Sequence, residues 1–331
     1  MNEEIVLKDV KLSMIKVHPK LKLCVAVGNR SIRIFDFVFN TLTKYIDSDK
    51  QETYTCCDFL EGFDRFEKVY FLCLGGESGL IKIINLQNGR LYAYFRGHTG
   101  SIRDIKTFDN YIISCSDDSS IRVWDIKENK CAVVMGGILG HRDRICSVDV
   151  NKKKTKLLSG GHDFTFREWD LKDALIKYNT TKQQQFLFQP LKSYEGIHKS
   201  IITKVAYYGD IMITLSNDII NMTYGETNNF DLNINRERKF FYNDFFFLGN
   251  INMYEICSTF KIIDNVLVGL GKTDSMFLFN LLDISEKNNV PYIIRLKGNE
   301  PLDFDICQDD LFVLFANRIY RVKHDLTRYC D

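Results

Sequence analysis

Two groups of side chains with matching spacing have the residue types of an acid–base site. Each holds one His, one Ser, one Asp and one Trp, with the Ser four residues before the Asp and the Trp six residues after it. The groups are His98, Ser114, Asp118 and Trp124, and His141, Ser159, Asp163 and Trp169. A positioned His beside a carboxylate can transfer protons. The same four types can also form a hydrogen-bonded chain that fixes a fold when every member is satisfied.

The structural interpretation is favoured because the two groups are copies within a repeat. A Gly-His pair opens each copy at 97–98 and 140–141, and a Trp-Asp pair closes it at 124–125 and 169–170. The two His residues are 43 positions apart and the two Trp residues 45. A period of about 40–45 residues with these ends is typical of WD-repeat propeller blades. We therefore predict that the eight side chains form two hydrogen-bonded networks, here called staples, each of which holds one blade together. We also predict that no catalytic residue is present.

Weaker copies of the repeat run along the rest of the chain. A third group has Tyr in place of Trp and consists of His198, Thr214, Asp218 and Tyr224. Aligned segments place seven residues at the Trp position: Phe35, Ile84, Trp124, Trp169, Tyr224, Phe279 and Val322. Short alternating strands are typical of four-stranded antiparallel blades, and seven blades can close around a central channel. The sequence therefore predicts an all-β fold, a seven-bladed WD-repeat β-propeller.

The repeat spacing also predicts the domain organisation. A closed propeller can absorb a chain of 331 residues as one unit, so we expect a single domain over residues 1–331. The two longest intervals contain polar stretches, which predict loop insertions near 172–195 and 226–244. No segment has the pattern of a convincing long helix.

Composition argues against several classes of function. The net charge is +1, from 44 basic and 43 acidic residues, which predicts no strong direct binding to nucleic acid and no attraction to acidic membranes. The ten cysteines include no CxxC pair and no metal-like spacing, so we expect free thiols in a reducing compartment, no metal and no cofactor. We see no signal peptide and no membrane-spanning run.

Several segments go beyond a generic WD repeat. They are Thr53-Tyr54-Thr55-Cys56, the Ile83-Ile84-Asn85 that replaces Trp-Asp, Gly97 to Ile102, Gly136-Gly137 before Gly140-His141-Arg142-Asp143, Phe166 to Trp169, and Ile197-His198. In this order they resemble the extra sex combs / embryonic ectoderm development family, over roughly residues 50–225. Members of that family are WD-repeat subunits of Polycomb repressive complex 2. The resemblance implies a non-catalytic nuclear scaffold that acts on chromatin in transcription repression through histone methylation.

The resemblance also implies two partners. One face of the propeller would hold a helix of the SET-domain histone methyltransferase subunit, and the other a trimethyl-lysine of a histone tail peptide in an aromatic cage. Tyr54 falls on one cage aromatic, and Tyr254 with Glu255 falls near an adjacent aromatic pair. Ile15, or its neighbour Met14, falls near a fourth aromatic in the first blade. Two cage aromatics are thus missing from this chain.

Register in the repeat supports Tyr54 and Tyr254 independently. Aligned with the regular blades, both replace Ile102 and Ile145 at the start of the innermost strand, close to a mouth of the channel. Two tyrosines in place of core aliphatics favour a shared site. The alternative is that each tyrosine packs the rim and keeps its hydroxyl in water.

Two other functions compete with the scaffold. A generic WD-repeat adaptor, such as a ubiquitin-ligase substrate receptor, often ends its blades in Trp-Asp-x-Arg, but Lys127 and Lys172 take the Arg place here. An enzyme is the third hypothesis, and it conflicts with the assignment of the His, Ser and Asp groups as staples. Fold alone does not decide, because propellers serve many functions.

Overall fold

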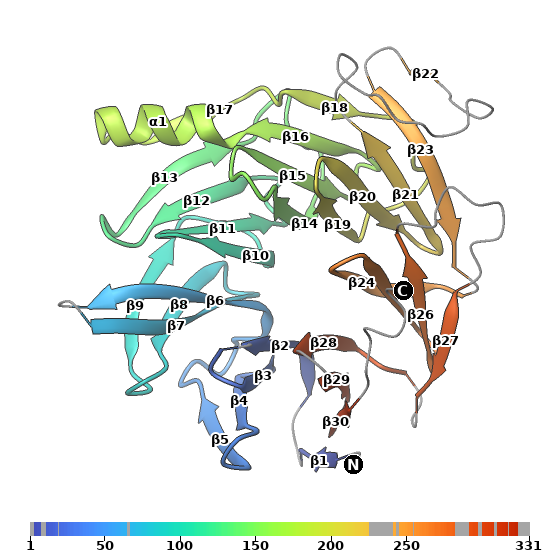
Figure 1. Cartoon of the computed structure of the whole chain (residues 1–331). Coiled ribbons are helices and arrows are strands. Elements are labelled where there is room, and N and C mark those ends of the chain that lie inside the picture. The colour runs from blue at the N-terminus through green and yellow to red at the C-terminus, as the bar shows by residue number, and fades with distance from the viewer. Residues whose placement is uncertain are drawn as a thin grey trace.

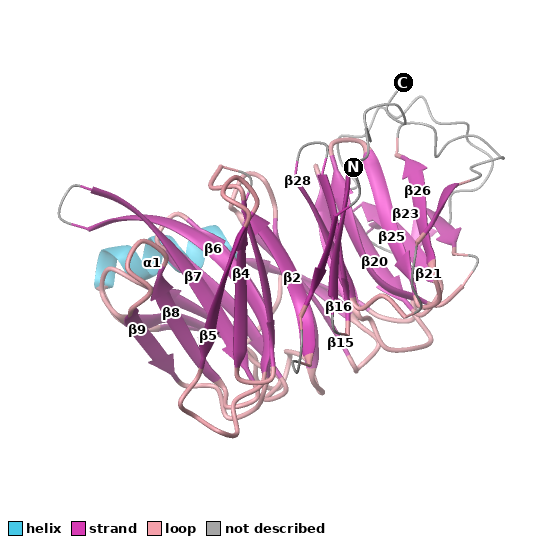
Figure 2. Cartoon of the chain, turned by 90° about the horizontal axis from the view of Figure 1, so that it is seen from below, coloured by secondary structure: helices cyan, strands magenta, loops and turns pink. Residues whose placement is uncertain are grey.

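The computed structural model is a ring of antiparallel sheets around a central channel (Figure 1). It describes residues 3–7, 11–18, 20–64, 67–224, 241–242, 245–253, 255–281, 291–296, 300–307, 310–316 and 318–323. Within these residues the strands form seven sheets, one for each predicted blade. Viewed at right angles, the strands run between two rims of loops (Figure 2). The prediction of a seven-bladed β-propeller is therefore confirmed.

The blades follow the order of the chain, and the first strands of neighbouring blades contact each other along the channel. Blade 1 comprises β2 (Leu12–His18), β3 (Leu23–Gly28), β4 (Ser31–Asp36) and β5 (Thr41–Ile46). Blade 2 comprises β6 (Tyr54–Asp64), β7 (Glu67–Gly76), β8 (Leu80–Asn85) and β9 (Leu91–Arg96). Blade 3 comprises β10 (Ile102–Phe108), β11 (Tyr111–Ser116), β12 (Ile121–Asp125) and β13 (Lys130–Met135), with β17 (Gln185–Leu187) added parallel to β13.

The remaining blades repeat this plan. Blade 4 comprises β14 (Ile145–Val150), β15 (Lys156–Gly161), β16 (Phe166–Asp170) and β18 (Lys192–Tyr194). Blade 5 comprises β19 (Lys204–Tyr208), β20 (Ile211–Ser216), β21 (Ile219–Tyr224), β23 (Phe245–Asn252) and the short β22 (Phe241–Tyr242). Blade 6 comprises β24 (Cys257–Ile263), β25 (Val266–Gly271), β26 (Ser275–Asn280) and β27 (Tyr292–Arg295). Blade 7 comprises β28 (Asp303–Cys307), β29 (Asp310–Phe315), β30 (Arg318–Lys323) and the N-terminal β1 (Glu3–Val6).

All seven residues predicted at the Trp position lie in the third strand of their blades, from Phe35 in β4 to Val322 in β30. The core consists of apolar layers between neighbouring blades, because alternate side chains of each strand face opposite blades. Cys56 packs between blades 2 and 3, whereas Cys57 packs between blades 1 and 2. The final layer joins blade 7 to blade 1 and includes Ile15 and Phe312.

Carboxylates on the innermost strands tie several neighbouring blades together. Asp58 accepts the backbone N–H of Thr107 at 2.9 Å, and Asp149 accepts that of Tyr207 at 2.8 Å. At the closure of the ring, Asp303 of blade 7 accepts the N–H of Ile15 in blade 1 at 3.0 Å. These bonds fix adjacent inner strands at a common height along the channel.

The insertion near 172–195 is a helix followed by strands, which corrects the predicted loop. Helix α1 (Leu171–Thr181) begins at Asp170, whose side chain caps the N–H of Asp173. It ends at Lys182, which adopts a left-handed conformation. Leu171, Ala174, Leu175 and Tyr178 are buried against blades 3 and 4. The predicted insertion near 226–244 lies almost entirely outside the described residues. No helix in the described ranges is long and apolar enough to cross a membrane.

Candidate functional site

The group predicted in blade 3 forms a continuous chain of hydrogen bonds. Trp124 Nε1 donates to Ser114 Oγ at 2.8 Å, and His98 Nε2 lies 2.8 Å from the same oxygen. On the other side of the imidazole ring, His98 Nδ1 lies 2.8 Å from Asp118 Oδ2. The Asp118 carboxylate also accepts the backbone N–H of Thr99, so the loop before the blade is tied to the turn between β11 and β12.

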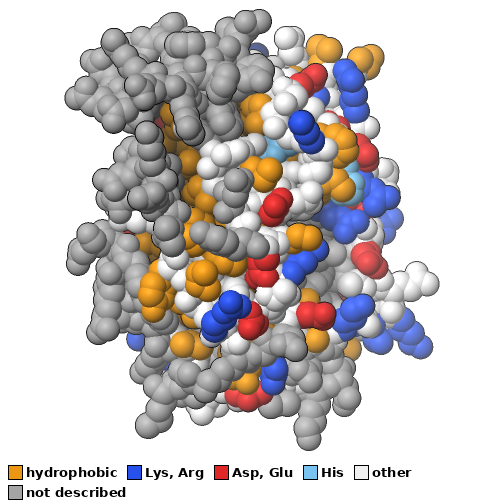
Figure 3. All heavy atoms as spheres, turned by 90° about the vertical axis from the view of Figure 1, so that its right-hand side faces the viewer, with side chains coloured by type: hydrophobic (Ala, Val, Ile, Leu, Met, Phe, Trp, Pro, Cys, Tyr) orange, Lys and Arg blue, Asp and Glu red, His pale blue; other side chains and the backbone are white. Residues whose placement is uncertain are grey.

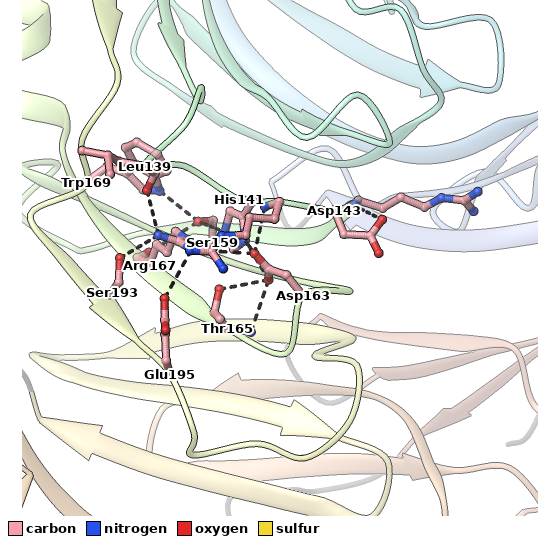
Figure 4. A network of polar contacts seen from close by, with 12 residues as sticks. Leu139, His141, Asp143, Ser159, Asp163, Thr165, Arg167, Trp169, Ser193 and Glu195 are labelled. Carbon is pink, nitrogen blue, oxygen red and sulfur yellow. Dashed lines mark hydrogen bonds and ion pairs between the residues drawn. The ribbon is translucent and has the colours of Figure 1, made fainter.

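Blade 4 repeats the same chain (Figure 4). Trp169 Nε1 donates to Ser159 Oγ at 2.9 Å, His141 Nε2 lies 2.8 Å from that oxygen, and His141 Nδ1 lies 3.0 Å from Asp163. Because the Trp N–H already donates to Ser159, the hydroxyl can donate to Nε2 and the Nδ1–H to the carboxylate. A neutral imidazole therefore satisfies every member of the chain.

Protonation and burial agree with a structural role for these groups. Burial lowers the pKa of His141 below its usual range despite the adjacent Asp163. Burial alone would raise the pKa of Asp163, but the hydrogen bonds that its carboxylate accepts, first from His141 and then from the Arg142 N–H and Thr165, outweigh burial and lower that pKa. Ser114 and Ser159 are both 0% exposed, so neither hydroxyl can reach a substrate in this conformation. The arrangement can hold a blade together, but it offers no accessible nucleophile.

The group predicted in blade 5 is only partly formed. His198 Nε2 lies 2.7 Å from Thr214 Oγ1, and Tyr224 is buried in β21. Asp218 is exposed, and no contact with His198 is present in the described part of the chain, so its assignment to the group was wrong. The β20–β21 turn has two residues where blade 3 uses four, so it does not reach back to the His. Asn221 Nδ2 approaches His198 Nε2 at 3.3 Å instead.

Two further staples were missed by sequence reasoning. Glu52 accepts a 2.5 Å hydrogen bond from Ser78 Oγ in blade 2, and Glu255 accepts one from Thr273 Oγ1 in blade 6. Each Glu stands two residues before the first residue of an innermost strand. The second strand of each blade ends in a glycine, where a side chain would overlap the carboxylate. Glu at that position with Gly ending the second strand is the signal that could have found them.

Tyr54 is not an open wall of a methyl-lysine cage in this structure. Its side chain is 2% exposed, and its hydroxyl donates to Asp47 Oδ2. The ammonium of Lys82 lies 5.7 Å from the Tyr54 ring centroid and 2.6 Å from the same Asp47 oxygen. A lysine of the chain itself thus already makes the cation–π contact that the cage prediction reserved for a ligand. Burial, followed by the bond to Asp47, raises the pKa of Tyr54.

The register argument for Tyr254 was wrong. Tyr54 pairs with Gly76 and Ile102 with Ser116, and the equivalent pair in blade 6 is Cys257 with Gly271. Cys257 therefore starts the innermost strand there. Tyr254 itself lies outside the described residues.

The other cage candidates are engaged elsewhere. Glu255 is tied to Thr273 as a blade staple, and Ile15 is 0% exposed in the layer between blades 7 and 1. The neighbouring Met14 Sδ accepts the backbone N–H of Cys57 at 3.3 Å. The described candidates are therefore not gathered around a common space.

A cavity of about 270 Å³ lies at the outer part of blade 4, between the loop of residues 138–142 and residues 189–195. A second cavity of about 260 Å³ shares Arg142, Arg167 and Glu195 with it. Arg167 is anchored by Nη1, which donates to the Leu139 carbonyl at 2.8 Å and to Ser193 Oγ at 2.7 Å (Figure 4). We call the two hollows together the blade 4 pocket. Within the described residues, no group of three His, Cys, Asp or Glu side chains is arranged to hold a metal ion.

Comparisons with known proteins find one matching family and several similar proteins. The family described as "WD domain, G-beta repeat" matches residues 89–125 and 133–170. Polycomb protein EED of Chaetomium thermophilum is 32% identical over 150 residues, 43% of this chain and 26% of the relative. Polycomb group protein FIE2 of Zea mays is 32% identical over 192 residues, 54% of this chain and 50% of the relative. Polycomb protein esc of Drosophila virilis is 24% identical over 188 residues, 52% of this chain and 44% of the relative.

These alignments span half or less of the length of the curated relatives. Solved structures extend the likeness of fold to almost the whole chain. A chain of Chaetomium thermophilum Polycomb Repressive Complex 2 superimposes with a TM-score of 0.76 at 16% identity, covering 97% of both chains. A chain of an active polycomb repressive complex 2 in the basal state gives 0.76 at 14% identity, again covering 97% of both. The protein is a seven-bladed WD-repeat β-propeller, and its resemblance to the extra sex combs and embryonic ectoderm development group of Polycomb proteins is confirmed.

Proposed function

We propose that this chain is a non-catalytic WD-repeat scaffold of a Polycomb-type histone methyltransferase complex and that it works in the nucleus. The observation that carries the proposal is the set of Polycomb relatives from insects, a fungus and plants. The buried staples support a scaffold over an enzyme, because the His, Ser and Asp groups are satisfied inside the blades. The propeller would bind the SET-domain methyltransferase subunit, and its effect on chromatin would be repression of transcription.

Affinity purification from nuclear extract tests the proposal. The tagged full chain should retain a SET-domain histone methyltransferase, and the tag alone should not. Recovery of ubiquitin-ligase subunits without a methyltransferase would favour the adaptor hypothesis and contradict the proposal. Absence of the chain from nuclei of the cells that express it would contradict the nuclear assignment.

A methylation assay tests the catalytic part separately. The isolated chain should transfer no methyl groups to histones, and its addition should raise the activity of the purified methyltransferase subunit. An Asp143→Ala variant serves as a control, because Asp143 is exposed and outside the staples. This variant should raise the activity of the methyltransferase subunit as the wild type does. Methyl transfer by the isolated chain, or no effect on the partner, would contradict the scaffold assignment.

Binding of a methylated histone tail is a separate proposal, and we propose that it is weak or missing. The Tyr54 ring faces the Lys82 ammonium, and Ile15 is buried. Calorimetric titration with trimethylated and unmodified histone peptides should show little difference between them. Tight methyl-specific binding that Tyr54→Phe keeps and Tyr54→Leu abolishes would contradict the proposal, because it would show that the Tyr54 ring opens to a ligand. Tight methyl-specific binding that Tyr54→Leu leaves unchanged would place the site elsewhere.

A further inference from the structure

Five large apolar side chains are exposed on the two segments that flank the blade 4 pocket, and three of them, Ile138, Leu139 and Leu191, line it. The five are between 49% and 93% exposed and comprise Ile138, Leu139, Phe186, Phe188 and Leu191. The N–H of Gly136 donates to the Leu187 carbonyl at 3.0 Å, which holds the two segments together. Phe186 and Phe188 stack with their rings 10° from parallel. On the face drawn in Figure 3, hydrophobic side chains reach the surface next to charged ones.

Basic side chains form the other part of the pocket lining. Arg142, Arg167 and Lys192 line the hollow next to Ile138 and Leu139, where the only acidic lining residue is Glu195. Arg142 is exposed, and no carboxylate of the described residues lies within ion-pair distance of it. In the second hollow Asp163 is a further acidic lining residue, so over the whole pocket three basic side chains face two acidic ones beside an apolar wall.

Arg167 is buried, and its hydrogen-bond donors are not all satisfied. Its side chain is 4% exposed, and its Nη2 lies 3.8 Å from the carboxylates of both Asp163 and Glu195, beyond hydrogen-bond distance. Within the described residues its Nε has no hydrogen-bond partner. Burial lowers the pKa of this guanidinium. A buried cation whose donors are not all satisfied is costly, so an incoming anion would gain from pairing with it.

We infer that the blade 4 pocket docks a partner peptide segment that presents a carboxylate beside an apolar side chain. The carboxylate would pair with Arg142 and the Arg167 guanidinium, because planar guanidinium groups bind carboxylates through paired hydrogen bonds. The apolar side chain would cover Ile138 and Leu139. This inference rests on the pocket alone and holds whether or not the Polycomb assignment is correct.

The inference is tested with peptides selected from a displayed library of random short sequences for binding to the purified chain. The enriched peptides should contain Asp or Glu next to Leu, Ile or an aromatic residue. Their affinity, measured by fluorescence polarisation, should fall by about tenfold or more in Arg142→Gln, because a neutral amide cannot pair with a carboxylate as the guanidinium does. Ile138→Asp should weaken binding similarly, by adding a negative charge to the apolar wall.

Matched controls separate docking from damage to the fold. Ile176→Asp places the same change on an exposed face of α1, and Arg144→Gln removes an exposed arginine of the same loop that does not line the pocket. Both controls should bind the peptides as the wild type does. The inference is overturned if no peptide is enriched, if the enriched peptides lack acidic residues, or if the controls weaken binding as much as Arg142→Gln and Ile138→Asp.

Discussion

At the scale of residues, one structural task is performed by different chemistry in different blades. A loop before the blade is tied to the turn between the second and third strands. His and Asp do this in blades 3 and 4, while Glu with Ser78 or Thr273 does it in blades 2 and 6. The His pattern has a recognisable spacing, so it could be predicted. The Glu pattern leaves a weaker signal, because it consists only of a Glu two residues before the innermost strand and a Gly at the end of the second strand, with no Trp or Gly-His pair to mark the repeat.

Removal of a staple carboxylate should destabilise the fold without any effect on chemistry. In Asp163→Ala, the Nδ1–H of His141 and the backbone N–H of Arg142 lose their acceptor. Unsatisfied buried donors cost about 1–3 kcal/mol, and Asp118→Ala should behave alike. Thermal and denaturant unfolding of the purified variants measures the loss, with the exposed Asp143→Ala as control. Wild-type melting accompanied by loss of an enzymatic activity would contradict the structural assignment.

Acidification should destabilise the protein through its buried histidines. Burial lowers the pKa of His198 from 6.5 to about 4. Between these values the unfolded chain binds a proton that the folded chain excludes, so this contribution to stability is complete above pH 6.5 and falls as the pH approaches 4. Denaturant unfolding over this range should show a shallower pH dependence in His198→Gln than in the wild type. Equal slopes in the two proteins would show that His198 does not set this dependence.

At the scale of elements, α1 shows where polar composition misleads. The segment from Lys172 onward is polar overall and predicts a loop. A capping side chain at Asp170 and a short buried face are enough to form a helix once blades 3 and 4 supply the surface. Tertiary packing of this kind supplies most helix stability in proteins. The strand predictions succeeded because alternation and turn residues recur seven times.

The bond between α1 and blade 3 gives a test of this packing. Tyr178 Oη donates to Asp125 Oδ2 at 3.1 Å, and both side chains are buried. Tyr178→Phe keeps the ring but removes the donor, which should lower the free energy of unfolding by about 1–2 kcal/mol. Tyr111→Phe is the matched control, since its hydroxyl bonds to the exposed Asn179 and its loss should cost little. Equal losses in the two variants would contradict a stabilising role for the buried bond.

At the scale of the whole molecule, the sequence predicts the number of blades but not how the ring closes. Blade identity follows from the Trp position, which a single chain reveals by internal comparison. Closure depends on β1, which pairs antiparallel with β30 from the opposite end of the chain. A four-residue strand whose partner lies more than three hundred residues away leaves no local periodicity to detect. Asp303 and Asp305 accept backbone hydrogen bonds from blade 1, and no sequence pattern predicts these contacts either.

Deletion of residues 1–6 should open this closure. The deletion removes the pairing of β1 with β30, the packing of Ile5 against the layer between blades 7 and 1, and the 3.4 Å ion pair between Glu4 and Arg318. Ile5 is partly buried, so its loss costs less than that of a fully buried aliphatic side chain, about 1.5–3 kcal/mol. The deletion also leaves β30 as an unpaired edge, which favours association between chains. A lower melting temperature and larger species in size-exclusion chromatography are therefore expected together. Glu4→Ala, which removes only a surface ion pair worth about 0–1 kcal/mol, should melt close to the wild type. A deletion variant that melts like the wild type and stays monomeric would show that blade 7 is stable with three strands and that β1 does not close the ring.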